Sequence, residues 1–260
     1  MSIKSIKSKI NDKICVPVIG LTLTEFLDNL ITIQEQHNFV ELRLDYICDL
    51  ETKDLLKIKK ILTVKSITTC RPNWEGGFYN KSEIERIEIL KKCLELGFDY
   101  VDIELKTAMS NCTKIINKKD KPKKKKNQAL QDQVEKPNPP TLDLNKKHTD
   151  TKIILSYHNF QKTDNYRNLR QIQTRMQGFG CDIKKIACMI TKPEDNIILT
   201  RLLTNKTKGE EIIVLGMGEN SKFMRLNTIL LGGFLTFATI GNHKTASGQM
   251  TLEEVRNALS

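Results

Sequence analysis

The residue of this 260-residue sequence best suited to covalent chemistry is Lys185, inside the apolar run IKKIACMI (183–190). If this run is a strand, Lys185 faces away from the apolar residues that would pack against helices. An inward lysine loses its water, which favours the uncharged amine, a nucleophile for ketones. The alternative, given nearly equal weight, is that Lys185 snorkels to the bottom of the sheet or pairs with Asp102 or Glu104. Lys184, on the other face, is predicted to be an ordinary surface lysine.

A histidine at the end of another apolar run could transfer protons. The run KIILSYHNF (152–160) places His158 directly after its apolar residues, followed by Asn159 and Phe160. Imidazole titrates near neutral pH, so His158 suits general acid and base catalysis. A single histidine is more often structural, but its place at a strand end favours the catalytic interpretation.

Alternating charges mark a third run. In ELRLD (41–45), Glu41, Arg43 and Asp45 are separated by leucines, so on a strand all three share one face. These charges would then point into the site rather than into the helix layer. The alternative is a structural network of charges that fills the interior of the sheet, and for Asp45 it is the better interpretation.

After the next run, an arginine precedes a loop that contains a glutamate. Arg71 ends VKSITTCR, and the loop PNWEGGF follows, in which Gly76 and Gly77 permit a tight turn directly after Glu75. The loop would hold the acid at the edge of the site. Taken alone, Arg71 could be an ordinary surface ion pair.

The last part of the chain offers groups suited to a carboxylate. The loop LGMGENSKFMRL leads to Arg225, whose planar guanidinium can hold a carboxylate with two hydrogen bonds. The segment HKTASGQM (243–250) adds the hydroxyls of Thr245 and Ser247 and the amide of Gln249. These small polar groups around a glycine are what a lid over a site would supply.

These residues must be positioned by regular elements, and β-branched runs alternate with amphipathic segments along the whole chain. The strands that we predict span residues 13–20, 39–47, 64–71, 100–105, 151–158, 183–190, 211–218 and 235–241. Helices are expected between them, for example over 23–38, 81–97 and 192–203, and the last helix begins with a capping box of Thr251 and Glu254. Eight strands alternating with helices predict a (β/α)8 TIM barrel, whose active site lies at the C-terminal ends of its strands.

The length suits a single catalytic domain over residues 1–260, but the charge is unevenly distributed. Residues 106–151 hold 12 Lys and 5 Asp or Glu, so they carry +7 of the net charge of +11. Such a segment cannot bury enough apolar surface to fold, so we predict a disordered surface insertion between strands 4 and 5. Without a bilayer-spanning stretch, a signal peptide or paired cysteines, we expect a cytoplasmic protein with reduced thiols and no membrane partner.

Taken together in chain order, these motifs resemble the type I 3-dehydroquinate dehydratase family, imine-forming enzymes of the shikimate pathway. The resemblance covers the chain apart from the insertion. It is carried by ELRLD (41–45), TCRPNWEGG (69–77), DIEL (102–105), SYHNF (156–160), KIACM (185–189), GMGENSKFMR (216–225) and TASGQ (245–249). It implies a hydro-lyase that converts 3-dehydroquinate into 3-dehydroshikimate, as a homodimer, without an organic cofactor or a metal.

The resemblance also implies a role for each site residue. Lys185 would form the imine, His158 would take the C2 proton and return a proton to the departing C1 hydroxyl, and Glu75 would orient His158. The remaining contacts are Glu41, Arg43 and Arg71 with the substrate hydroxyls, Arg225 with its carboxylate, Gln249 from the lid, and Phe160 and Met217 in the pocket wall.

The sequence departs from the family pattern in three places. The lid reads T-A-S-G-Q where S-A-P-G-Q is usual, with one extra residue upstream, so either Thr245 or Ser247 could replace the lid serine. Asn159 stands where Asp is common, and the Lys-rich insertion takes the place of a short helix. We expect the insertion to have no effect on the chemistry.

Two other functions are compatible with parts of the sequence. A class I aldolase also places an imine-forming lysine on the sixth strand, but a phosphate-binding loop late in the barrel would be expected. Arg225 and Gln249 occupy that region and suit a carboxylate instead. A nucleic-acid-binding protein is supported only by the Lys run, which has no interleaved aromatic residues, so we expect no nucleic-acid partner.

Overall fold

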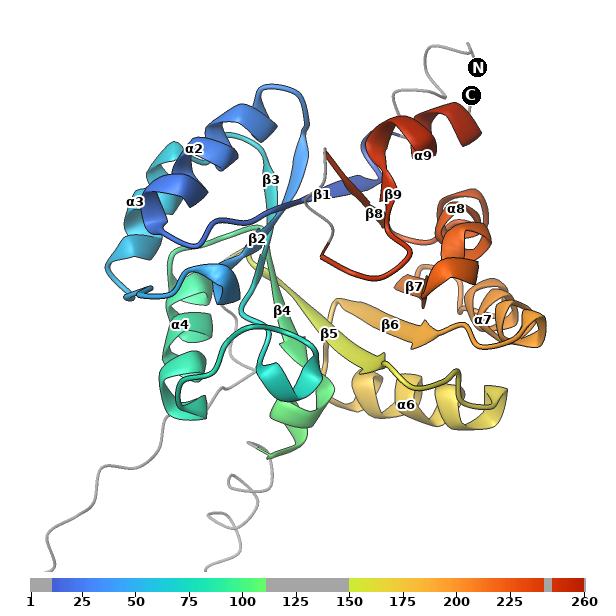
Figure 1. The fold of residues 1–260 in the computed structure, drawn as a ribbon. Helices are drawn as coiled ribbons and strands as arrows, with labels where there is room; N and C mark the ends of the chain where they lie inside the picture. Colours follow the sequence, from blue (N-terminus) through green and yellow to red (C-terminus); the bar gives the residue numbers. More distant parts are fainter. Residues whose placement is uncertain (1–10, 111–149, 241–244, 260) are drawn as a thin grey trace, which may run out of the picture.

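Parallel strands alternate with helices and curl into a barrel, as the sequence predicts (Figure 1). The computed structural model describes residues 11–110, 150–240 and 245–259. The strands are β1 (Ile14–Val18), β2 (Phe39–Arg43), β3 (Lys65–Thr69), β4 (Tyr100–Glu104), β5 (Lys152–Asn159), β6 (Ile183–Met189), β7 (Glu211–Met217), β8 (Thr236–Thr239) and β9 (Met250–Thr251). All eight predicted strands are confirmed, and the short β9 was not predicted.

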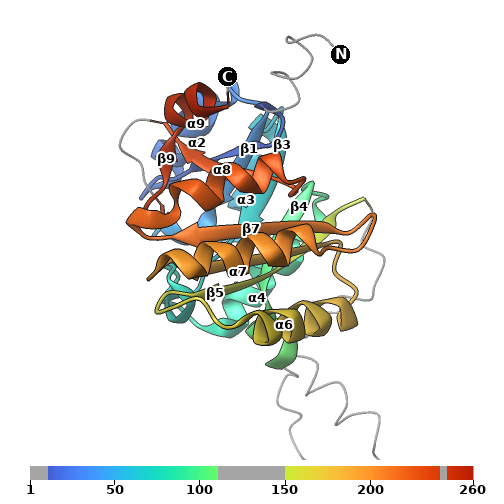
Figure 2. The ribbon, with the colours of Figure 1, turned by 90° about the vertical axis from the view of Figure 1, so that its right-hand side faces the viewer.

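The helices surround the strands, and α6, α7 and α8 lie side by side on one flank (Figure 2). They are α2 (Leu23–Gln34), α3 (Asp54–Ile61), α4 (Glu83–Glu95), α6 (Tyr166–Gly178), α7 (Pro193–Thr204), α8 (Lys222–Leu230) and α9 (Leu252–Ala258), with 3-10 turns η1 (Leu44–Tyr46), η2 (Asn73–Glu75) and η3 (Glu219–Ser221). The predicted capping box of Thr251 and Glu254 is confirmed at the start of α9. Among the described residues, no helix has the length and apolar character needed to cross a membrane.

The strand order shows how the sheet closes. It runs β7-β6-β5-β4-β3-β2-β1-β8-β9, so β1 lies between β2 and β8. The two ends of the curl meet near the start of β8, where the backbone N–H of Phe234 donates to the oxygen of Ile212 in β7 at 2.8 Å. The C-terminal ends of the barrel strands therefore gather at one mouth, as the fold requires for a site.

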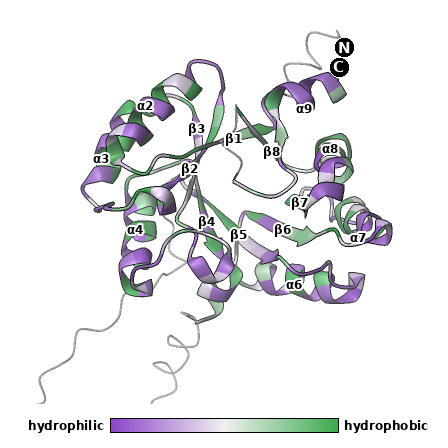
Figure 3. Cartoon of the chain, viewed as in Figure 1, coloured by the Kyte–Doolittle hydropathy of each residue, from purple (hydrophilic) through white to green (hydrophobic). Residues whose placement is uncertain are grey.

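Apolar residues form a layer on each side of the strands. The outer layer packs the strands against helices whose polar residues lie on their other faces (Figure 3). The inner layer fills the bottom of the barrel, where the rings of Phe39 and Tyr100 stack at 5.6 Å and Phe234 packs against both. Side chains that follow on the inner face of each strand are held above this apolar floor, at the mouth.

Three expectations at element ends need correction. β2 ends at Arg43 rather than at residue 47, and the chain turns into η1, so Asp45 is not on the strand. Lys184 is not a surface lysine: it is 6% exposed, and its amine donates to Glu210 at 2.6 Å. Most of the predicted Lys-rich insertion, residues 111–149, lies outside the described residues, but residues 105–110 at its start are helical.

Candidate active site

Lys185 points into the barrel from β6 and is 4% exposed. Its Nζ donates to Oδ2 of Asp102 at 2.8 Å and lies 3.7 Å from Oε1 of Glu41. The ring of Phe237 covers the amine at 4.7 Å from its centroid. The inward orientation predicted from strand periodicity is confirmed, and so is the contact with Asp102 that was the alternative. The two interpretations describe one arrangement, a buried amine with a close counter-ion.

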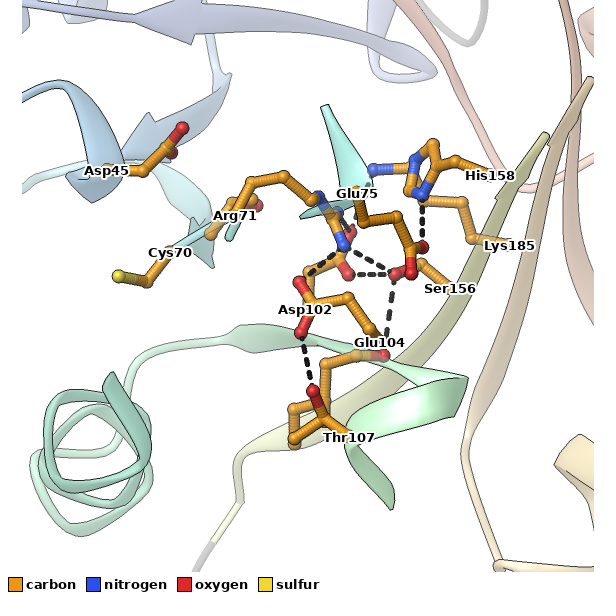
Figure 4. Close-up of polar contacts among 12 residues, drawn as sticks. Asp45, Cys70, Arg71, Glu75, Asp102, Glu104, Thr107, Ser156, His158 and Lys185 are labelled. Carbon is orange, nitrogen blue, oxygen red and sulfur yellow. Dashed lines mark hydrogen bonds and ion pairs between the residues drawn. The ribbon is translucent and has the colours of Figure 1, made fainter. Parts of the chain in front are cut away.

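Asp102, on β4, is the centre of a buried charge network (Figure 4). Besides Lys185, its Oδ2 contacts Nη2 of Arg71 at 2.8 Å, and its Oδ1 accepts the hydroxyl hydrogen of Ser156 at 2.6 Å. The other terminal nitrogen of Arg71 donates to Glu104 at 2.6 Å and to Ser156 at 2.8 Å. Burial alone would raise the pKa of Asp102, but Arg71 and Lys185 hold that pKa well below its usual range. Asp102 therefore stays an anion at neutral pH.

Arg86, on α4, extends this network outward. Its fully buried guanidinium contacts Oε2 of Glu104 at 2.7 Å and donates to the backbone oxygen of Cys70 at 2.9 Å. The sequence analysis missed Arg86, because an arginine among the charges of an amphipathic helix is usually exposed. No signal in the single sequence separates it from its exposed neighbours.

His158 and Glu75 form a close pair beside Lys185. Nδ1 of His158, near the end of β5, lies 2.8 Å from Oε1 of Glu75, which ends η2. The next residue, Gly76, has a φ of 74°, and a Cβ there would lie 2.3 Å from the ring of Phe160. The turn therefore requires glycine.

The electrostatic surroundings shift the protonation of both members of this pair. Burial raises the pKa of Glu75 to about 8, although Arg71 opposes the shift. Burial, followed by the charges of Arg71 and Lys185, lowers the pKa of His158 well below its ordinary value. The imidazole is therefore uncharged near pH 7. Because Nδ1 is bonded to Glu75, Nε2 is the atom left for a substrate, and it is free to accept a proton when Glu75 is ionised.

The charged residues of the ELRLD segment have two different roles, since one faces Lys185 and the other two form an ion pair. Glu41 accepts the hydroxyl hydrogen of Thr69 at 2.9 Å and faces Lys185. Arg43 makes two hydrogen bonds to Asp45, at 2.9 and 2.8 Å, and the backbone N–H of Phe78 donates to the same carboxylate. Asp45 thus ties β2 to the loop after β3, which agrees with the structural interpretation preferred for it.

Arg225, on α8, is as buried as Arg71 but has no carboxylate partner among the described residues. It is 2% exposed, and its guanidinium meets only the hydroxyl of Ser221 at 3.3 Å and the backbone oxygen of Ser247 at 3.4 Å. Burial lowers its pKa to about 10, so it remains a cation at neutral pH. A buried cation without a counter-ion is costly, and a bound anion would compensate it.

These groups line one cavity at the mouth. Its polar wall consists of Glu41, His158, Lys185, Arg225, Thr245 and Gln249, and its apolar wall consists of Ala187, Leu215, Met217, Phe237 and Ala246. The lid residue on the wall is Thr245, whose backbone N–H and hydroxyl both contact Oε1 of Gln249, at 2.8 and 3.2 Å. Ser247 is not on the wall and contributes its backbone oxygen to Arg225.

Three residues expected to touch a substrate lie outside this wall. Arg43 and Arg71 are both engaged by carboxylates behind it. Phe160 is 45% exposed in an adjoining groove with Trp74, and its ring stacks on His158 at 6.0 Å between centroids. Phe160 follows the end of β5, so it turns outward past the strand rather than into the barrel.

A family model described as Type I 3-dehydroquinase matches residues 14–126 and 132–260. The chain belongs to the type I 3-dehydroquinase family.

Curated relatives and solved structures agree with this family. The 3-dehydroquinate dehydratase of Coxiella burnetii (strain CbuK_Q154) is 36% identical over 245 residues, which cover 94% of this chain and 91% of that protein. The 3-dehydroquinate dehydratase of Methanococcus maripaludis (strain S2) is 32% identical over 246 residues, 95% of this chain and 98% of that protein. The crystal structure of 3-dehydroquinate dehydratase from Geobacillus kaustophilus HTA426 has a TM-score of 0.73 at 22% identity, over 95% of this chain and 90% of that one. This last likeness shows the shared barrel fold.

Membership of the type I 3-dehydroquinase family makes the chain an enzyme, and its cavity contains groups that the motifs alone did not single out. Phe237, over the amine of Lys185, and Leu215, beside Met217, lie on the inner faces of β8 and β7. Period-two alternation along the predicted strands was the signal that could have found both residues. No group of three or more His, Cys, Asp or Glu side chains is arranged to hold a metal within the described part of the chain.

Proposed function

We propose that this chain dehydrates 3-dehydroquinate to 3-dehydroshikimate through an imine on Lys185, in the shikimate pathway of aromatic amino acid biosynthesis. One observation carries the proposal. A single cavity brings together a buried amine, a neutral imidazole backed by Glu75, and the unpaired cation of Arg225. An amine for the ketone, a base for the neighbouring C–H and a cation for the carboxylate are what this substrate needs.

The first step joins Lys185 to the C3 ketone of the substrate. An ammonium group and a ketone give a protonated imine and one water, so the positive charge stays on the nitrogen. The buried position of Lys185, under Phe237, keeps bulk water from the imine and slows its hydrolysis.

The second step is a β-elimination run by one residue. The protonated imine withdraws electrons and acidifies the C2–H, and Nε2 of His158 takes that proton. His158 then donates the proton to the C1 hydroxyl, which leaves as water. His158 is then neutral again, with Nδ1–H donating to the ionised Glu75 carboxylate. One water hydrolyses the product imine, which releases 3-dehydroshikimate and restores the amine of Lys185.

The residues that line the cavity wall indicate which groups would contact the substrate. Arg225 would hold the substrate carboxylate, and Glu41 would accept a hydrogen bond from a substrate hydroxyl. Thr245 and Gln249, already in contact with each other, would close over the substrate together with Met217. Arg43 and Arg71, which lie behind the cavity wall, would act indirectly by orienting side chains that touch the substrate. The homodimer and the cytoplasmic location remain predictions.

The proposal can be tested by assaying dehydration directly. The product is a conjugated enone carboxylate, so adding 3-dehydroquinate to the protein should produce a rising ultraviolet absorbance that the substrate lacks. The neighbouring lysines provide a matched pair of variants. Lys185→Ala should abolish the signal, whereas Lys184→Ala, which removes the outward ion pair with Glu210, should retain it. Absence of any enone with the unaltered protein would overturn the proposed reaction.

A further inference from the structure

Asp102 is a fully buried carboxylate with three close partners, and the proposed reaction gives it no role. It is fully buried and receives hydrogen bonds or ion pairs from Lys185, Arg71 and Ser156, each at 2.8 Å or less. It does not line the cavity, so a substrate in the cavity would not touch it. Its direct contact with a group proposed to react is the hydrogen bond from the amine of Lys185.

We propose that Asp102 is a positioning residue for the imine, which aims Nζ of Lys185 at the ketone and remains the counter-ion of that nitrogen after the imine has formed. This inference rests on the proposed function, because it assumes that Lys185 reacts. Lys185 could react without Asp102 as its partner, so the role of Asp102 is tested separately.

The hydrogen count of the reaction supports this role. The ammonium group carries three hydrogens, two of which leave with the ketone oxygen as water, so the protonated imine keeps one N–H. One acceptor is therefore sufficient for the imine. Oδ2 of Asp102, at 2.8 Å, is already in that position, whereas Oε1 of Glu41 lies at 3.7 Å. Because Asp102 already pairs with this amine and the protonated imine is a cation, Asp102 need not move or change its charge when the imine forms.

The partners of Asp102 fix its orientation. Ser156 holds Oδ1 at 2.6 Å, and Arg71 shares Oδ2 with Lys185, so the carboxylate plane is held at both oxygens. The sharing also limits the negative charge that faces the imine. A fully available carboxylate would favour the charged imine over the neutral enamine that follows proton removal, and Arg71 offsets part of that preference.

Glu41 is a different kind of neighbour. It lies on the cavity wall, and its Oε1 is already bonded to the hydroxyl of Thr69 at 2.9 Å. It is therefore placed to meet the substrate, whereas Asp102 lies behind the wall and contacts the lysine from there. Of the two carboxylates near this amine, Glu41 would bind the substrate and Asp102 would position the lysine.

The test is Asp102→Asn, which keeps the shape of the side chain but removes its charge. We expect kcat to fall about 100-fold with KM changed by less than about threefold, because the group acts on the reacting nitrogen and not on substrate binding. The fraction of chain trapped by sodium borohydride at saturating 3-dehydroquinate should fall in parallel. An Asp102→Asn protein with kcat and trapping within about threefold of the unaltered enzyme would overturn the inference.

Glu104→Gln is the matched control. Glu104 is equally buried and also pairs with Arg71, but it has no contact with Lys185. We expect Glu104→Gln to lower the thermal midpoint by about as much as Asp102→Asn does, while most of the trapped adduct is kept. Equal loss of trapping in both variants would show a merely structural effect and overturn the inference.

A failure of the proposed function would be recognised separately, since the unaltered protein would then form neither enone nor adduct. If Asp102→Asn does not fold, Ser156→Ala carries the test, because it frees Oδ1 of Asp102 and leaves every charge in place. A lower kcat at constant KM supports the inference, and an unchanged kcat overturns it.

Discussion

The two sides of the barrel mouth handle buried cations in opposite ways. On the side of β3 and β4, Arg71 lies within 2.8 Å of the carboxylates of Asp102 and Glu104. On the side of β7 and β8, Arg225 is equally buried, but its partners among the described residues are a hydroxyl and a backbone oxygen, at 3.3 and 3.4 Å. The first side pairs its cation with carboxylates, whereas the described residues of the second side leave a cation that an anionic ligand could pair with.

This difference separates charges that build the site from charges that bind a ligand. Removing one partner of a satisfied buried pair leaves an uncompensated charge, whereas removing an unsatisfied charge relieves one. The same replacement of arginine by methionine should therefore change stability in opposite directions on the two sides.

The largest effect is expected for Arg86→Met, on the satisfied side. It would leave Glu104 with one cation fewer in a fully buried setting, so the free energy of unfolding should fall by about 3–5 kcal/mol. Urea unfolding followed by circular dichroism measures this value. A loss below about 1 kcal/mol would mean that the network does not depend on Arg86.

Arg225→Met should have the opposite effect on stability and a large effect on binding. Without a substrate, loss of an unpaired buried cation should raise the free energy of unfolding by about 1 kcal/mol. With 3-dehydroquinate as substrate, KM should rise about 100-fold, because the carboxylate loses its charged partner. Both values come from one protein preparation, by urea unfolding and by the enone assay. An unchanged KM would contradict the assignment of Arg225 to the carboxylate.

Glu75→Gln should change the pH profile of the reaction. Because burial raises the pKa of Glu75 to about 8, the carboxylate takes up a proton as the pH falls through that value. Protonated Glu75 donates to Nδ1 of His158, which moves the imidazole hydrogen to Nε2 and blocks the base, so kcat/KM should fall below about pH 8.

In Glu75→Gln that titration is absent, and the pKa of His158 is itself low. The acid limb of kcat/KM should move to lower pH, with a maximum reduced about tenfold. An acid limb at the same pH in both proteins would assign the titration to another group. Substitution of Trp74, which shares the adjoining groove with Glu75, is the control for local disturbance.

The smallest effect concerns the lid. Thr245 lies on the cavity wall and Ser247 does not, so Thr245→Val should raise KM about fivefold while Ser247→Ala should leave it unchanged. The pair of variants sharpens the comparison, because Ser247 touches Arg225 through its backbone oxygen, which alanine retains. A larger effect from Ser247→Ala would reverse the assignment of the lid hydroxyl.

The sequence predicted the elements that obey a strict period and the side chains that lie within them. Lys185 lies inside a strand whose neighbours alternate, so its facing follows from the chain alone, and the apolar run before His158 places that residue near the end of its strand. The same reasoning extended β2 to residue 47, past its end at Arg43. There the chain turns into η1, where Asp45 pairs with Arg43 and accepts a hydrogen bond from the backbone N–H of Phe78.

What the sequence could not provide were the long-range partners. The bond between Arg71 and Ser156 joins residues that lie 85 positions apart, and local periodicity carries no information about it. Arg86 and Lys184 were missed or misplaced for the same reason, since each is buried by a partner on another element. The resemblance placed Phe160 in the pocket wall, whereas it lies just past the end of β5, in the adjoining groove.

The measurement that tests the central claim most directly is reductive trapping of the imine. The protein is incubated with 3-dehydroquinate and sodium borohydride, and the adduct is located by intact-mass and peptide mass spectrometry. The account predicts one adduct, on Lys185, that is absent in Lys185→Ala and retained in Lys184→Ala. No adduct, or an adduct on another lysine, would contradict it and return Lys185 to a structural role as the partner of Asp102.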